Sequence, residues 1–228
     1  MKLRNSQANI VALRDGFKLY GYADQYMFRT LVRVRTWEPA TAAVIRQELK
    51  VGGTFIDAGG GLGFYTALAR RLVGPKGKVL SFEPHPENYR CILLSVEALK
   101  KVHNVAVYAA ALGSAFGTAR LWTNPGNEGD NRLDSVEHIR MDDSFDVVVL
   151  PLDSLNIEPT GPVVMKMDVQ GAECDVLLGA AEFCARYQPV IVAENNDTLY
   201  GDALTVMLDK MGYVVTPIRG KDVVARPK

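Results

Sequence analysis

Short apolar runs alternate with longer amphipathic segments over most of the chain from residue 54 onward. The runs have the length of buried strands, and the segments between them repeat apolar residues at helical spacing. The pattern predicts strands over 54–58, 78–83, 105–112, 163–168, 189–194 and 213–218, and helices over 63–74, 85–102, 171–187 and 198–212. Strands that alternate with helices form parallel sheets with helices on both faces. The right-handed crossover rule then favours a doubly wound α/β fold with a mostly parallel sheet.

The first 50 residues follow a different pattern. Residues 10–21 alternate around the turn signal Asp15-Gly16, which predicts a hairpin. Residues 38–50 carry apolar side chains at helical spacing with Pro39 in the first turn, which predicts a helix. We therefore expect residues 1–50 to form an extension that packs on a core of residues 51–228, all within one domain.

Residues 114–155 interrupt the alternation of strands and helices. Two extended segments, 118–123 and 145–155, flank a polar loop of residues 124–144. Long loops inside compact domains are usually functional or mobile. The pattern predicts an inserted β-hairpin that carries a lid loop.

Composition and charge narrow the class of protein. The chain has 228 residues, 48% of them hydrophobic, and 26 basic residues balance 26 acidic ones. This balance gives no general attraction to nucleic acid or to an anionic membrane, so we expect neither as a partner. The longest apolar stretch, 147–152, is far too short to span a bilayer. Three isolated cysteines and an N-terminus without a signal-peptide pattern predict reduced thiols in a cytoplasmic protein. The oligomeric state is left open.

A glycine-rich turn follows the first predicted core strand. Its spacing fails the dinucleotide pattern GxGxxG, because Phe64 or Thr66 stands at the third position, depending on the starting glycine. It also lacks the Gly-Lys-Ser/Thr of a phosphate-binding loop. Gly59, Gly61 and Gly63 nevertheless allow the backbone to approach a ligand and turn tightly into the next helix.

Two acids accompany these glycines. Asp57 precedes them, where a carboxylate suits an ammonium or sulfonium cation better than a pyrophosphate. Glu83 ends the next strand, 24 residues beyond Gly59, where an acid can accept hydrogen bonds from both ribose hydroxyls. A ribose without phosphates beside a cation describes S-adenosylmethionine, which we predict as the cofactor.

Further polar residues could serve a methyl acceptor. Asp168 ends a core strand on the side where ligands bind in open α/β sheets, and it is our first candidate for a general base. Capping of the following helix is its structural alternative. Glu173 and Glu194 are candidate substrate residues, although the helix dipole alone would explain Glu173. In the predicted lid, Asp130 is the second candidate base and Arg132 a candidate for substrate contact or lid closure, and a solvated loop is the alternative.

A metal-assisted variant stays open at this point. Glu194 and Asn195 end the strand after that of Asp168, and oxygen ligands at neighbouring strand ends suit Mg²⁺. We predict no metal as the main interpretation. Two rival classes are an NAD-type oxidoreductase on a similar sheet and a non-catalytic module that binds the cofactor without turnover.

The ordered set "FIDAGGGLGFYT", "GPKGKVLSFEPHPENY", "AAALG", "MKMDVQGAE" and "VIVAEN" resembles FkbM-type methyltransferases over residues 37–196. The resemblance implies the class I methyltransferase fold, which is Rossmann-like, with S-adenosylmethionine as cofactor. It also implies O-methylation of a hydroxyl on a small molecule, a sugar or a secondary metabolite.

The same resemblance assigns residues to parts of the cofactor. Asp57, Gly59, Gly61 and Gly63 would line its methionine end, and Glu83 would hold its ribose. Flanking residues for the adenine would be Ala110, Ala111 and Leu112. The chain departs from the family pattern twice, with Gln170 in place of a glutamate and Asn131 in place of a histidine in the lid.

Overall fold

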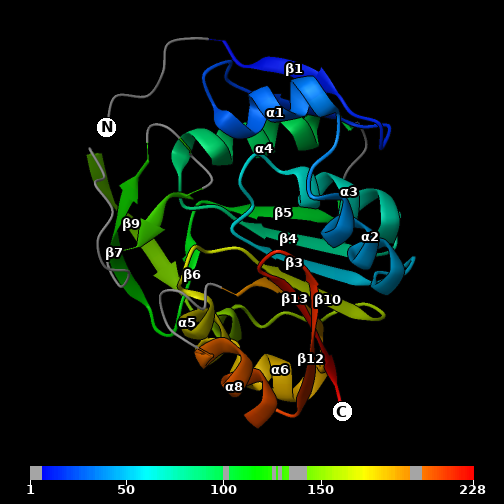
Figure 1. The fold of residues 1–228 in the computed structure, drawn as a ribbon, viewed down its shortest axis with the longest axis vertical. Helices are drawn as coiled ribbons and strands as arrows, with labels where there is room; N and C mark the ends of the chain where they lie inside the picture. The colour runs from blue at the N-terminus through cyan, green and yellow to red at the C-terminus, as the bar shows by residue number, and fades with distance from the viewer. Residues whose placement is uncertain (1–6, 100–102, 125–126, 128–129, 134–142, 196–201) are drawn as a thin grey trace.

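A computed structural model of the chain describes residues 7–99, 103–124, 127, 130–133, 143–195 and 202–228. Its centre is a seven-stranded sheet (Figure 1) with the order β12-β13-β11-β10-β3-β4-β5. The parallel strands are β3 (Thr54–Ala58), β4 (Lys78–Phe82), β5 (Val105–Tyr108), β10 (Val163–Met167) and β11 (Val190–Glu194). The predicted mostly parallel sheet is confirmed.

The last two strands form an antiparallel pair at one edge of this sheet. β12 (Tyr213–Arg219) pairs with β13 (Asp222–Pro227), and β13 inserts antiparallel beside β11. The sequence pattern predicted β12 but not β13. The insertion brings Asp222 opposite Glu194, at the carboxyl end of β11.

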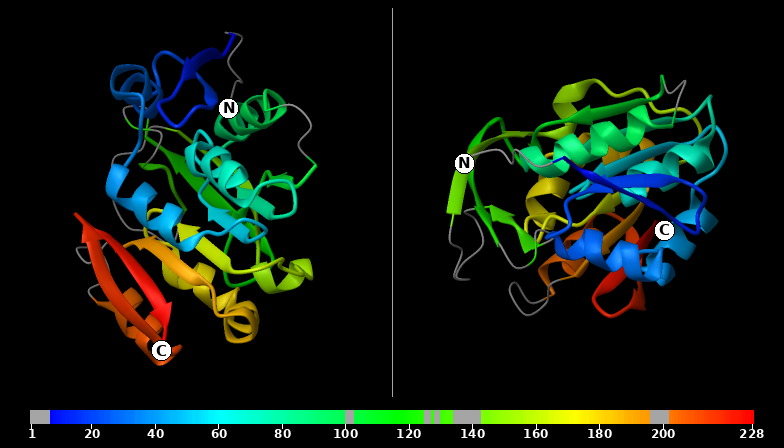
Figure 2. Two further views of the ribbon diagram at one scale, coloured as in Figure 1. Left: turned by 90° about the vertical axis from the view of Figure 1, so that its right-hand side faces the viewer. Right: turned by 90° about the horizontal axis from the view of Figure 1, so that it is seen from above.

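Helices cover both faces of the sheet (Figures 1 and 2), as predicted. One face carries α2 (Pro39–Glu48), α3 (Phe64–Val73) and α4 (Pro86–Glu97), and the other carries α5 (Glu173–Leu178), α6 (Ala181–Tyr187) and α8 (Ala203–Lys210). The prediction of one continuous helix over 171–187 is wrong. The helix is interrupted between α5 and α6, at Gly179. An added Cβ on Gly179 would lie 1.9 Å from the carbonyl oxygen of Gly113.

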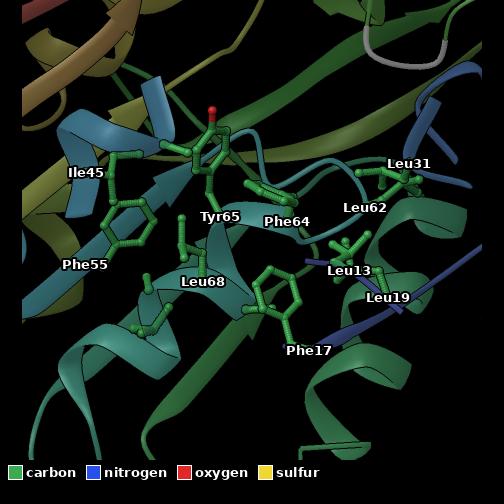
Figure 3. Close-up of a cluster of buried hydrophobic side chains, with 14 of the residues drawn as sticks. Leu13, Phe17, Leu19, Leu31, Ile45, Phe55, Leu62, Phe64, Tyr65 and Leu68 are labelled. Atoms are coloured by element: carbon green, nitrogen blue, oxygen red, sulfur yellow. The ribbon is translucent and has the colours of Figure 1, made fainter. Parts of the chain in front are cut away.

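Alternation along the strands divides the core into two clusters. Phe55 of β3 and Val164 of β10 pack in the cluster on the side of α2 to α4, part of which Figure 3 shows. Their neighbours Ile56 and Met165 pack in the cluster on the opposite face. Successive side chains of a strand point to opposite faces. Asp57 and Lys166, two residues beyond Phe55 and Val164, therefore face α2 and α3.

The N-terminal residues add a hairpin and a helix above α4 (Figure 1). β1 (Asn9–Ala12) pairs antiparallel with β2 (Lys18–Gly21), which confirms the predicted hairpin. α1 (Tyr26–Val34) was not predicted. The buried Gln25 amide donates to Asn88 Oδ1 of α4 at 3.0 Å. The division into an extension of residues 1–50 and a core stays a prediction.

A second, four-stranded sheet contains the predicted inserted hairpin. Its order is β6-β9-β7-β8, with β6 (Ala111–Leu112), β7 (Gly117–Thr123), β8 (Arg132–Leu133) and β9 (Asp143–Leu150). The short helix η2 (Leu152–Leu155) follows it. The predicted strand over 105–112 is split between the two sheets as β5 and β6. Of the predicted lid loop, positions 125, 126, 128, 129 and 134–142 lie outside the described residues.

None of the described helices is both long enough and apolar enough to cross a membrane.

Candidate active site

A cavity of about 410 Å³ opens at the carboxyl ends of the parallel strands. The described residues of its wall come from the glycine turn after β3, from the ends of β4, β10 and β11, from β6 and β8, and from the N-terminal segment. The wall includes Met27, Glu38, Gly59, Gly61, Tyr65, Glu83, Ala111, Leu112, Asp130, Arg132, Lys166, Asp168, Gln170, Glu194, Lys221 and Asp222. This is where ligands bind in open α/β sheets.

The glycine turn combines close packing with an open wall. Gly59 and Gly61 have φ angles of +82° and +54°, which disfavour residues with a side chain. An added Cβ on Gly59 would lie 2.0 Å from the Asp168 carbonyl oxygen. On Gly61 it would meet only Met27 Sδ, at 3.7 Å. Gly59 is therefore needed for the fold, whereas Gly61 leaves room in the cavity.

Glu83 presents a buried carboxylate on the cavity wall. Its Oε2 accepts a hydrogen bond from the Gly61 N–H at 2.7 Å, and its Oε1 accepts one from the His85 N–H at 2.8 Å. The side chain is 5% exposed, and this burial raises its pKa to about 7, although the two N–H groups lower it. The Asn88 side chain is a third hydrogen-bond partner of this carboxylate. Of its roughly four lone-pair sites, about one stays open to a hydroxyl donor. The grip of Glu83 on ribose hydroxyls stays a prediction.

Asp57 lies behind the glycine turn and not on the cavity wall. It is 1% exposed, and its Oδ2 accepts a hydrogen bond from Thr66 Oγ1 at 2.6 Å. Burial raises its pKa to about 6, and the nearby Lys166 ammonium opposes this shift. The described cavity wall includes neither Asp57 nor Gly63. Strand alternation turns this side chain toward Thr66 of α3, and the direct contact of Asp57 with a ligand cation stays a prediction.

Ala111 and Leu112 of β6 contribute apolar surface to the wall, while Ala110 is buried without bordering the cavity. Contact of this surface with adenine stays a prediction.

Asp168 lies on the wall with an ammonium group beside it. Lys166 Nζ is 3.0 Å from Asp168 Oδ2 and 4.8 Å from the centre of the Tyr65 ring. Lys166 is 4% exposed. Burial disfavours its charge, but the carboxylates of Asp168, Asp57 and Glu38 outweigh burial and raise the pKa of Lys166. Lys166 therefore stays charged beside Asp168.

Glu38 is a wall residue that the sequence interpretation missed. It precedes α2 with φ 34° and ψ 69°, a left-handed conformation that is strained for a residue with a side chain. Its Oε2 accepts a hydrogen bond from the Tyr65 hydroxyl at 2.7 Å. Figure 3 shows that hydroxyl directed away from the apolar cluster. Burial raises the pKa of Glu38, which makes its carboxylate a better proton acceptor.

Gln170 links the two acids at neighbouring strand ends. With φ 54°, it directs its amide nitrogen to Asp168 Oδ1 at 2.7 Å and to Glu194 Oε2 at 2.9 Å. Amide hydrogens thus occupy the position that a shared cation would take. Asn195, the third candidate ligand, donates instead to Thr205 Oγ1 at 3.3 Å. The donor set does not fit the Mg²⁺ alternative, and no group of three potential His, Cys, Asp or Glu ligands occurs within the described residues.

Glu173 closes the turn after β10. Its carboxylate accepts hydrogen bonds from the Val169 N–H at 3.2 Å and the Gly171 N–H at 3.0 Å. Burial raises its pKa to about 7. It is absent from the described cavity wall, so the structure favours the local explanation over substrate contact.

Asp130 and Arg132 reach the cavity from the start of the inserted loop. Arg132 donates from Nε at 3.0 Å and from Nη2 at 2.7 Å to Asp130 Oδ1. The other oxygen, Asp130 Oδ2, accepts from Asn124 Nδ2 at 3.2 Å. The two residues therefore form one charge-paired unit on the wall, and their contact with an acceptor stays a prediction.

Other charged wall residues were also missed. Asp222 accepts a hydrogen bond from Thr41 Oγ1 and comes from the unpredicted strand β13. Lys166 had a visible signal, since it is the one charged residue inside the apolar run 163–167. Glu38 and Asp222 had none, because only the tertiary structure brings them to the cavity.

The chain is similar to one protein family over most of its length. The family model described as the methyltransferase FkbM domain matches residues 54–215, which is most of the chain. No curated protein matches the sequence.

Solved structures share the fold at low identity. A methyltransferase FkbM from Methylobacillus flagellatus KT is 17% identical with a TM-score of 0.55, over 76% of this chain and 43% of its own. Trm5b from Pyrococcus abyssi is 14% identical with a TM-score of 0.52, over 97% of this chain and 56% of its own. A tRNA m1G37 methyltransferase from M. jannaschii is 10% identical with a TM-score of 0.51, over 99% of this chain and 58% of its own. This chain thus spans about half the length of these structures, and the likeness shows the class I methyltransferase fold.

Proposed function

The chain belongs to the FkbM methyltransferase family, whose cofactor is S-adenosylmethionine, and on that premise we propose that it methylates a hydroxyl group of a small molecule, such as a sugar or a secondary metabolite. One observation carries the proposal. A single cavity joins a glycine turn and a ribose-type acid, Gly61 and Glu83, to carboxylates that can take a proton, Asp168 and Glu38.

The part of the cavity lined by Gly61, Glu83, Ala111 and Leu112 suits the cofactor. Glu83 offers a carboxylate to ribose hydroxyls, and Gly61 leaves the space that a side chain would fill. Ala111 and Leu112 offer an apolar surface for a flat base. When bound, S-adenosylmethionine supplies an electrophilic methyl group, so the protein has to align the acceptor and exclude water.

The part of the cavity lined by Asp168 and Glu38 suits a hydroxyl acceptor. A hydroxyl is a weak nucleophile until a base within hydrogen-bond reach takes its proton. Both Asp168 oxygens already accept hydrogen bonds, from Lys166 and Gln170. Glu38 accepts only the bond from Tyr65 among the described residues. We therefore keep Asp168 as a candidate base and add Glu38, while Asp130 is bound by Arg132.

The size and charge of the cavity support a small acceptor that is neutral or cationic. Its volume of about 410 Å³ lies in the range of small-ligand sites. Among its described residues, six are acidic and three are basic. Such a wall attracts cations and repels phosphates, which argues against a nucleic-acid acceptor.

The rival functions have less support. The glycine spacing fails the dinucleotide pattern, and the family match is to methyltransferases, which argues against an NAD-type oxidoreductase. A metal-assisted reaction would need a cation between Asp168 and Glu194, where the Gln170 amide donates hydrogen bonds to both acids. A protein that binds the cofactor without catalysing a reaction would not need the carboxylates of Asp168 and Glu38 in the same cavity.

The test is transfer of an isotopically labelled methyl group. The protein is incubated with labelled S-adenosylmethionine and a panel of methyl glycosides, amino sugars, polyols, macrolactones and catechols, with bulk tRNA as a separate arm. We expect one class of small hydroxyl compound to gain a methyl group, with the carbon shift of a methyl ether in the NMR spectrum.

Methylation at nitrogen or carbon, or label found only in RNA, would contradict the proposed acceptor. Absence of transfer to any compound, with cofactor bound, would favour the non-catalytic module. A Gly61→Val variant, in which a side chain fills the cofactor space, is the negative control.

A further inference from the structure

Arg132 has one nitrogen that the fold leaves without an acceptor. One edge of its guanidinium, Nε and Nη2, is bound to Asp130 Oδ1. The remaining nitrogen, Nη1, is buried and has no hydrogen-bond partner in the described part of the chain. The side chain is 12% exposed and forms part of the cavity wall. Buried donors of this kind are nearly always satisfied, so a bound ligand is the natural acceptor.

The other cationic groups of the wall are engaged. Lys166 donates to Asp168, and Lys221 also has an interaction partner. The N–H groups of the four glycines in the turn are engaged as well. Those of Gly59 and Gly60 donate to the Phe82 carbonyl oxygen, that of Gly61 to Glu83, and that of Gly63 to the Gly60 carbonyl oxygen.

The cofactor carries one negative group, the carboxylate of its methionine part. Its sulfonium and ammonium groups suit a wall with six acids, whereas this carboxylate needs a donor that the acids do not already hold. A guanidinium binds a carboxylate through charge-assisted hydrogen bonds. Asp130 holds the guanidinium in place from the opposite edge.

We propose that Arg132 Nη1 binds the methionine carboxylate of the cofactor. This assignment rests on S-adenosylmethionine as the cofactor, and it gives the inserted sheet a role in cofactor recognition. Arg132 then acts on the cofactor and not on the acceptor, so its contribution is independent of which hydroxyl compound is methylated.

The test compares two ligands by calorimetry with the full chain. One is S-adenosylhomocysteine, and the other is its decarboxylated analogue, whose side chain ends in the amine alone. We expect the wild type to bind S-adenosylhomocysteine about 10- to 100-fold more tightly than the analogue, the range for a hydrogen bond between charged groups. Arg132→Gln should lose that factor for S-adenosylhomocysteine and keep the wild-type affinity for the analogue.

Two further variants separate this role from a general one. Arg120 lies on β7 of the same sheet and pairs with Asp146 at 2.9 Å outside the cavity, so Arg120→Gln should leave both affinities unchanged. Arg132→Lys keeps the charge without the forked geometry and should give an intermediate preference. If Arg132→Gln does not fold, the wild-type comparison and Arg132→Lys still decide.

Three results would overturn the assignment. The first is equal affinity of the wild type for both ligands. The second is an Arg132→Gln variant that retains full affinity for S-adenosylhomocysteine. The third is an Arg132→Gln variant whose affinity for both ligands falls by the same factor. In each of these cases the wild type still binds S-adenosylhomocysteine, so the proposed function survives. Failure of the wild type to bind it would overturn the cofactor premise and this inference together.

Discussion

Substitution of Gly59 and Gly61 by alanine should separate the structural part of the glycine turn from its ligand-facing part. Both residues have positive φ angles, +82° and +54°. They differ in what an added Cβ would meet. At Gly59 it would lie 2.0 Å from the backbone oxygen of Asp168, whereas at Gly61 it would meet only the flexible end of Met27 at 3.7 Å.

The expected magnitudes follow from this difference. A left-handed conformation costs a residue with a Cβ about 1–2 kcal/mol, and this applies to both variants. For Gly61→Ala we expect little more, which lowers the melting temperature by about 2–8 °C in a chain of this size. For Gly59→Ala the backbone of β3 or of the turn after β10 must also move. We expect a total loss above about 3 kcal/mol, among the severe effects of single substitutions.

The assay combines thermal unfolding with S-adenosylhomocysteine binding. Gly61→Ala should stay folded and lose affinity for S-adenosylhomocysteine, because its methyl group enters the cavity. Gly59→Ala should unfold at a clearly lower temperature. The reasoning is refuted if Gly59→Ala is as stable as Gly61→Ala, or if Gly61→Ala binds S-adenosylhomocysteine as tightly as the wild type.

Three other predictions concern Glu83, the contact between Gln25 and Asn88, and Glu38. Because burial raises the pKa of Glu83 to about 7, its stabilising contribution is present below about pH 4.5 and is lost as the pH rises through 7. S-adenosylhomocysteine affinity should instead rise between about pH 6 and 8 as the carboxylate forms, and calorimetry of Glu83→Gln should show a flat profile. Gln25→Ala removes a buried partner of Asn88 and should lower the free energy of unfolding by about 1–3 kcal/mol in urea denaturation. If Glu38 is the base, Glu38→Gln should abolish the acid limb of the kcat profile without changing S-adenosylhomocysteine affinity, whereas Asp168→Asn should keep that limb.

Local patterns were enough to predict the parallel strands of the central sheet, although not β13. The apolar run 54–58 is β3 at the predicted residues, and the glycines after it turn the chain into α3. These features depend on neighbours in the chain, because strand length, helical spacing and glycine conformations are local properties. The position of Glu83 on the cavity wall followed from the same reasoning, since parallel strands end at one edge.

The face on which a side chain lies was decided by the tertiary structure. Asp57 was assigned to the ligand from its place before the glycines, but the packing of β3 against α3 turns it to Thr66. The direction of a strand's side chains depends on which face each helix covers, and no local pattern states this.

The part of the cavity lined by Glu38 and Asp222 depends most on contacts between distant parts of the chain. Glu38 reaches Tyr65 across 27 residues, and Asp222 reaches Thr41 across 181. The sequence by itself determined the doubly wound sheet, the glycine turn and the acid Glu83 that follows β4, because each follows from short-range spacing. Only the tertiary structure decided that Glu38, Lys166, Asp168 and Asp222 share one cavity, because strand order and the antiparallel insertion of β13 arise from long-range packing.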